Sequence, residues 1–189
     1  MRNIIATLAL MSIAAGYFGY ARRFQLAAKI WHWRHGYTTT MGNYEVPVPE
    51  HWLITDQDSV AFTMMNTAPA LHKYGKFQTA AVISIFPFRN RPIASGGLDS
   101  WLSLKRKRLE IEGVKSIEEK NFAIGGAEAS CVGGSEVRDV VFPNVTNPPD
   151  TDVISLECRS ADDLSVLFIG EPSDLQPFYL FAAQIRRVR

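Results

Sequence analysis

The sequence is poor in the features that mark several specialised classes of protein. It has 2 cysteines in 189 residues, too few for a disulfide-rich scaffold or a zinc site built from cysteines alone. Its 20 Lys and Arg are balanced by 19 Asp and Glu, which argues against a nucleic-acid binder driven by bulk charge. With 47% hydrophobic and 21% charged residues, the composition is that of a globular protein. It excludes an intrinsically disordered chain and a multi-span membrane protein.

The common catalytic motifs are also missing. The sequence contains no G-x-S-x-G, H-E-x-x-H, P-loop or C-x-x-C pattern. Glu118 and Glu119 are adjacent, and neighbours in a strand point to opposite faces, so these carboxylates cannot converge on a substrate. His32 and His35 have a usable metal-ligand spacing but no acidic or Cys residue nearby, and we interpret them as residues of a membrane interface. We therefore predict no catalytic, cofactor-binding or metal-binding residues.

The chain does contain a long uncharged run near its start. Residues 4–21 hold 18 residues without a charge, just above the lower limit of about 17 for a helix that spans a bilayer. Residues 1–36 carry five basic and no acidic side chains, whereas the other 153 residues carry 15 basic and 19 acidic ones. We predict that residues 1–21 form a single-pass membrane anchor. A cleaved secretory signal and a buried globular helix are the alternatives.

Aromatic and basic side chains border this run, as is typical of a membrane–water interface. The predicted interface residues are Tyr17, Phe18, Tyr20, Arg22, Arg23, Phe24 and Trp31. Residues 22–42 are predicted to be a basic, amphipathic juxtamembrane linker, because Phe24, Ala27, Ala28 and Trp31 share one helical face. Such a helix would lie in the plane of the interface. Packing of this helix on the domain or on a partner is the alternative.

Two features of the sequence disagree on the side of the membrane on which the domain lies. Four Lys or Arg come after the uncharged run and only Arg2 precedes it, which favours a cytoplasmic domain. The short N-terminal tail and its similarity to a signal peptide favour export. We expect an extracytoplasmic, periplasmic domain, with the cytoplasmic side as the close alternative.

Residues 43–189 have the pattern of a soluble α+β domain. Pro47 and Pro49 forbid a helix at residues 44–49 and indicate an edge strand. Further strands are predicted at residues 60–65, 78–86, 116–124, 127–132, 137–141, 153–159 and 164–169, with an interruption at Gly133 and Gly134. Helices are predicted at 98–112 and 174–185. The basic run 105–108 points in four directions on the first of these helices, with Glu110 and Glu112 as partners.

The two cysteines each lie centrally in a predicted strand. If those strands are neighbours, Cys131 and Cys158 can form a disulfide, provided that their Cα atoms lie within about 7 Å. Two buried free thiols are the alternative. A disulfide would indicate an oxidising compartment.

Three stretches of the domain carry a resemblance to a known group of proteins. They are NYEVPVPEHWLI (residues 43–54), FAIGGAEASCVGG (122–134) and the closing SLECRSADDLSVLFIGEPSDLQPFYLFAAQIR (155–186), together with the helix at 98–112. Over residues 42–189 the chain resembles the PsbP-like and DcrB-like α/β/α sandwich superfamily. The resemblance implies an antiparallel sheet with packed helices. It also implies a non-enzymatic role, because members are mostly accessory subunits, chaperone-like binders and envelope proteins.

We therefore expect a non-catalytic, membrane-anchored accessory or binding protein that acts through protein–protein contacts of its α+β domain, for example as a subunit of a membrane complex. Its expected partners are the lipid bilayer and a membrane protein, and not nucleic acid. Its partner surface is expected to be apolar or aromatic and to involve Trp52, Phe86, Phe88 or Phe142. A binder of a small hydrophobic ligand is the alternative, and an enzyme is the third hypothesis.

Overall fold

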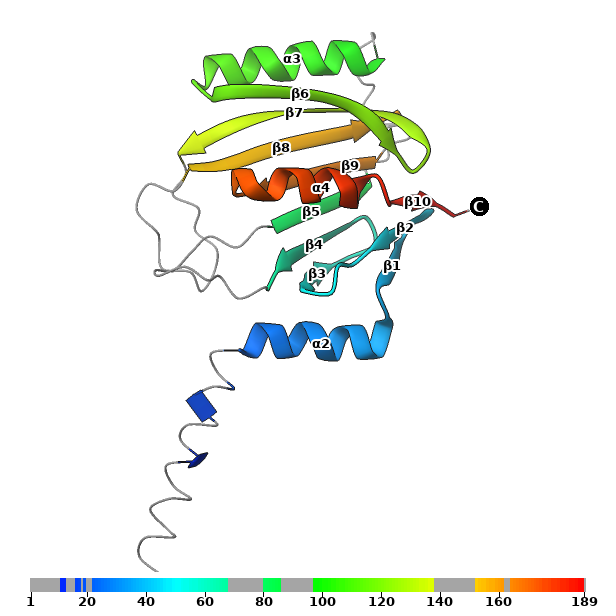
Figure 1. Ribbon diagram of the computed structural model, residues 1–189. Helices are drawn as coiled ribbons and strands as arrows, with labels where there is room; N and C mark the ends of the chain where they lie inside the picture. Colours follow the sequence, from blue (N-terminus) through cyan, green and yellow to red (C-terminus); the bar gives the residue numbers. More distant parts are fainter. Residues whose placement is uncertain are drawn as a thin grey trace, which may run out of the picture.

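The computed structural model describes residues 11–12, 16–17, 19, 22–67, 80–85, 97–137, 152–161 and 164–188. Most of the predicted anchor therefore lies outside the described residues, as do Phe18, Tyr20, Phe86, Phe88 and Phe142. Among the described residues, no helix is long and apolar enough to cross a membrane. The domain is a mixed α+β fold with antiparallel sheets, as predicted (Figure 1).

Seven strands form one large antiparallel sheet in the order β3-β4-β5-β9-β8-β7-β6. They are β3 (Trp52–Gln57), β4 (Ala61–Asn66), β5 (Ala80–Ile85), β6 (Lys115–Ile124), β7 (Ala127–Val137), β8 (Asp152–Ser160) and β9 (Leu164–Gly170). The hairpins β6–β7 and β8–β9 and the strand β5 confirm the predictions from the sequence. Strand β3 was recognised only as part of the family-like opening stretch.

The predicted interruption at Gly133 and Gly134 is wrong, because β7 runs through both residues. A Cβ atom at Gly133 would overlap the Ser155 carbonyl oxygen and lie 2.6 Å from the Leu156 Cα atom on β8. The glycine is therefore required by the close approach of two paired strands and does not end the strand.

A second, three-stranded sheet has the order β1-β2-β10, with β1 at Thr38–Met41, β2 at Tyr44–Pro47 and β10 at Arg186–Arg187. The prediction that residues 44–49 form an edge strand is wrong, since β2 lies at the centre of this sheet. Pro47 is tolerated because β10 pairs only with Tyr44 and Glu45 and stops short of it, and Pro49 lies outside the strand.

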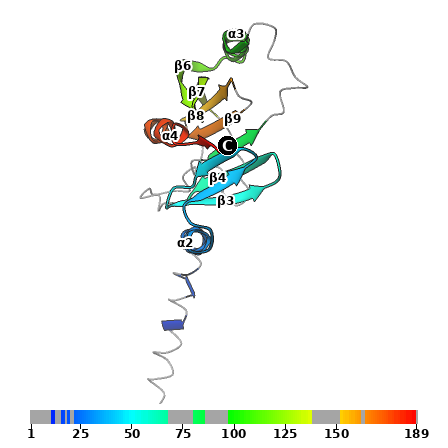
Figure 2. The ribbon, with the colours of Figure 1, turned by 90° about the vertical axis from the view of Figure 1, so that its right-hand side faces the viewer.

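Two helices cover opposite faces of the large sheet. Helix α4 (Leu175–Ala182), preceded by a 3-10 turn at Pro172–Asp174, packs its buried side chains into the main core together with strands β4, β8 and β9. Helix α3 (Gly97–Ile111) packs Trp101 and Leu109 onto Val132, which faces away from the main core on β7. Figure 2 shows α3 and α4 on either side of the sheet. This arrangement is the α/β/α order that the sequence predicts.

Ion pairs hold α3 on the sheet. Lys105 lies 2.9 Å from Glu157 of β8, and Arg159 lies 3.0 Å from the same carboxylate. Burial alone would raise the pKa of Glu157, but the hydrogen bonds and charges of these two cations outweigh it and lower the pKa. Glu110 and Glu112 pair with Arg106 and Arg108 as predicted.

Helix α2 (Arg23–His35) lies at one end of the domain, next to β3 (Figures 1 and 2). Together with β1 it lies in the segment that the sequence assigns to a linker. Ala28 and His32 are its buried residues, so the helix turns that face to the domain.

Candidate functional site

A half-open groove of about 640 Å³ lies between α4, the β2–β3 connection and the start of β1. This volume is within the usual range of about 300–1,000 Å³ for ligand-binding sites. The lining is mainly apolar and consists of Tyr37, Thr38, Pro47, Val48, Pro49, Trp52, Asn66, Asp174, Pro177, Phe178, Leu180, Phe181 and Gln184. It is the site that we consider for binding.

Helix α4 supplies the aromatic wall of the groove. Phe178 and Phe181 are buried, so α4 packs on the sheet as predicted. The predicted extent of 174–185 is too long, because α4 ends at Ala182, and the buried Ile185 lies beyond the helix. Phe181 stacks on Trp52 of β3 with ring centroids 6.3 Å apart. Leu180 lies on the other side of the same helix, lines the groove and is 59% exposed. The groove therefore offers a rigid aromatic wall and one exposed aliphatic side chain at its edge.

The charge in the groove is low. Of the described residues that line the groove, only Asp174 carries a charge at neutral pH. Across the part of the chain that the structure describes, no group of three or more His, Cys, Asp or Glu is arranged to hold a metal ion.

His32 fixes α2 beside the groove. Its Nδ1 atom lies 2.8 Å from the Gly36 carbonyl oxygen, and its Nε2 atom lies 3.0 Å from the Pro49 oxygen and 3.2 Å from the Trp52 oxygen. The Tyr37 ring stacks on the imidazole at 4.7 Å. Our interpretation of His32 as a membrane-interface residue is therefore wrong, because its ring is buried and connects α2 to the loop that forms the groove.

The structure places only part of the predicted partner surface. Trp52 is half-buried and lines the groove, whereas Phe86, Phe88 and Phe142 lie outside the described residues. The sequence did not single out the aromatic residues of α4 as a binding surface, because their spacing is the ordinary signal of a core-facing helix. Pro47 and Pro49 were interpreted only as determinants of strand structure.

Helix α2 has two apolar faces. The predicted interface face contains Phe24, Ala27, Ala28 and Trp31, but Ala28 is buried and the other three are half-buried. The structure thus favours the alternative in which this face packs on the domain. The opposite face carries Leu26, Ile30 and Trp33, which are 49%, 52% and 82% exposed.

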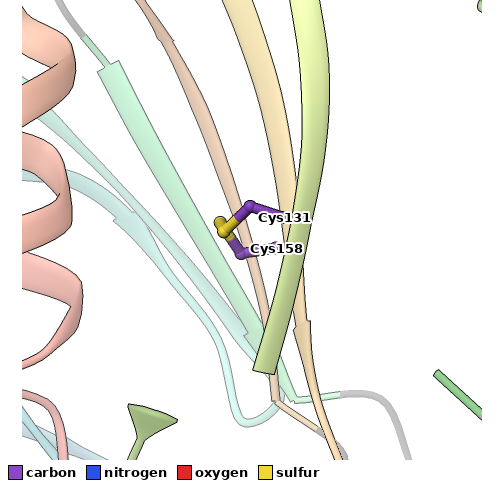
Figure 3. The surroundings of a disulfide bond; sticks show 2 residues. All are labelled: Cys131 and Cys158. Carbon is purple, nitrogen blue, oxygen red and sulfur yellow. A yellow bond between two sulfur atoms is a disulfide. The ribbon is translucent and has the colours of Figure 1, made fainter. Parts of the chain in front are cut away.

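Cys131 and Cys158 face each other directly across β7 and β8 and form a disulfide bond (Figure 3). Both residues are buried in the main core. The bond closes a loop with a sequence separation of 27, and a cross-link of that size restricts the unfolded chain.

We expect the double replacement Cys131→Ala, Cys158→Ala to lower the free energy of unfolding by about 3 kcal/mol, as estimated for a loop of this length. Chemical denaturation of the oxidised wild type, the reduced wild type and the double variant measures the free energy of unfolding of each. The reduced wild type and the double variant should unfold at similar denaturant concentrations. A variant as stable as the oxidised wild type would show that the bond does not stabilise the fold.

No family model and no curated protein matches the sequence. Among solved structures, the chain is similar to the solution structure of cyanobacterial PsbP (CyanoP) from Synechocystis sp. PCC 6803. The TM-score is 0.42 and the sequence identity 11%, over 77% of this chain and 86% of that one.

Proposed function

We propose that this protein is a non-catalytic, membrane-anchored accessory protein whose domain binds a protein partner in the groove beside α4. The observation that carries the proposal is the groove itself, with its aromatic wall of Trp52, Phe178 and Phe181 and, among its described lining residues, a single charged one. Aromatic side chains fixed in a partly enclosed apolar surface are typical of the residues that dominate protein–protein binding energy.

The shape of the groove favours an inserted side chain or short peptide segment. It is half-open, so part of its lining is reachable from solvent. Asn66, Asp174 and Gln184 supply polar groups among the apolar lining, as the rim of a binding site requires. Leu180 is exposed at the edge, where contact with a partner would remove it from water.

The anchoring part of the proposal rests on the sequence of residues 4–21 and on the helix that comes directly after them. This uncharged run leads into α2, which carries basic and no acidic side chains. The disulfide between Cys131 and Cys158 supports an oxidising compartment, so we propose an extracytoplasmic domain. Extraction with alkaline carbonate should leave the full-length protein in the membrane pellet, and its release would contradict the anchor.

Substitution of Leu180 tests the groove. Full-length protein with a tag after Arg189 would be purified from membranes of its source cells as wild type, Leu180→Asp and Leu104→Asp. Leu104 is the matched control, because it lies on α3 and is 57% exposed, against 59% for Leu180. We expect a partner that co-purifies with the wild type and with Leu104→Asp, and its loss with Leu180→Asp, since a buried unpaired carboxylate is costly. Equal recovery with both variants would contradict the groove as the binding site.

A small hydrophobic ligand is the second candidate occupant, and the volume and apolar lining of the groove favour it. Mass spectrometry of organic extracts from the same purified samples distinguishes the two. A lipid-like molecule present in wild type and Leu104→Asp but absent from Leu180→Asp would replace the protein partner in the proposal.

A further inference from the structure

The exposed face of α2 is an apolar stripe that nothing in the described domain covers. Leu26, Ile30 and Trp33 are separated by four and three residues and therefore fall within about 60° of one another around the helix. The stripe is opposite the face of Ala28 and His32, which packs on the domain. Single exposed apolar residues are normal, but three aligned on one helix, with Trp33 82% exposed, form a continuous surface.

Basic residues lie on both sides of this stripe. By the same helical geometry, Lys29 falls on one flank of Leu26, Ile30 and Trp33, and Arg34 falls on the other. Lys29 and Arg34 are exposed, and α2 contains no acidic residue. A central apolar stripe with cations on both flanks matches a bilayer surface, because apolar side chains can enter the acyl region while long basic side chains reach the phosphates.

We propose that α2 lies flat on an anionic lipid bilayer, with Leu26, Ile30 and Trp33 inserted and Lys29 and Arg34 at the headgroups. This inference rests on the proposed anchor, since the uncharged run ends at Ala21, two positions before α2 begins at Arg23. The face that docks on the membrane is thus the reverse of the one that the sequence indicated. The contact fixes the orientation of the domain, because His32 and the Ala28 face hold α2 on β3.

The groove would then lie near the membrane surface. Tyr37 comes after α2 at its C-terminal end, is 60% exposed, and is part of the groove lining. A partner bound in the groove would therefore contact the domain beside the bilayer, as expected for a segment of a membrane protein close to its spanning region.

Fluorescence quenching in lipid vesicles, performed on the full-length protein, tests the contact between α2 and the bilayer. The protein would be reconstituted into vesicles of phosphatidylglycerol and phosphatidylcholine in which part of the lipid carries bromine on the acyl chains, which quenches nearby tryptophan. The chain has 4 tryptophans, so Trp33→Phe is compared with Trp31→Phe, its half-buried neighbour on the other face. We expect the lipid-dependent quenching to disappear in Trp33→Phe and to persist in Trp31→Phe. The double variant Leu26→Glu, Ile30→Glu should also abolish it, and Leu104→Glu on α3 should not.

Flotation after a carbonate wash, performed on the same samples, separates this inference from the anchor. Protein that floats after the wash but whose Trp33 is not quenched would overturn the inference and leave the anchor intact; a protein partner or a second copy would then cover the stripe. Protein that is quenched at low salt but released by carbonate would overturn the anchor and support the stripe. If quenching in vesicles of phosphatidylcholine alone equals that in vesicles with phosphatidylglycerol, Lys29 and Arg34 do not contribute to membrane binding through anionic lipid.

Discussion

Replacement of Phe178 by Ala is expected to lower the free energy of unfolding of the domain by about 3–5 kcal/mol, the usual cost of removing a buried phenylalanine. The side chain is 3% exposed and stacks on Phe168 of β9 at a centroid distance of 4.6 Å. It therefore joins α4 to the centre of the large sheet. A loss of this size is a large part of the total stability of a domain, so the variant should be partly unfolded at physiological temperature.

Leu180→Ala is the matched control for Phe178→Ala. Both residues lie on α4, but Leu180 is 59% exposed, so its truncation should change stability by roughly half a kcal/mol or less. Chemical denaturation of the purified full-length proteins gives both values. Similar midpoints for Phe178→Ala and Leu180→Ala would show that α4 is not part of the core.

Replacement of Gly133 by Ala should have a still larger effect, with a loss of more than about 4 kcal/mol. The added methyl group would overlap the Ser155 carbonyl oxygen and approach the Leu156 Cα atom. Both obstacles are backbone atoms of the paired strand, so a change of rotamer cannot relieve them. Strands β7 and β8 would have to separate, with loss of their hydrogen bonds and of the packing that surrounds the disulfide.

Ser135→Ala is the control for this position, because Ser135 is half-buried on β7 two residues further along the strand. It should cost less than about 1 kcal/mol. The amount of soluble, protease-resistant protein and the denaturation midpoint report on both variants. A Gly133→Ala protein that folds with near-wild-type stability would mean that β7 and β8 are further apart than the structure shows.

The regular elements of the domain were predictable where one physical signal dominated. Helix α3 was predicted at residues 98–112 and is observed at Gly97–Ile111, and the β8–β9 hairpin was predicted as strands at 153–159 and 164–169. Strands β1 and β10 were not predicted, because TTTM and RR show no alternation of apolar and polar residues. They form strands through pairing with β2.

Gly133 shows why an isolated glycine pair misleads. Locally it resembles a turn, and only the approach of β8 reveals that the strand continues.

The candidate sites depended on tertiary information that periodicity does not contain. Helix α2 is apolar on two opposite faces, and the sequence does not say which of them packs on the domain. The groove was even harder to predict from the sequence. It lies between α4 and the β2–β3 connection, which is more than 100 residues earlier in the chain.

The most direct test of the proposed function is site-specific photo-cross-linking from the groove in membranes of the source cells. A photoreactive phenylalanine analogue would replace Leu180 at the groove edge or, as control, Leu104 on α3, which are 59% and 57% exposed. We predict one defined cross-linked membrane protein from position 180 and none from position 104. Cross-links of equal yield and identity from both positions, or none from position 180 in protein that is folded and membrane-bound, would contradict a partner site in the groove.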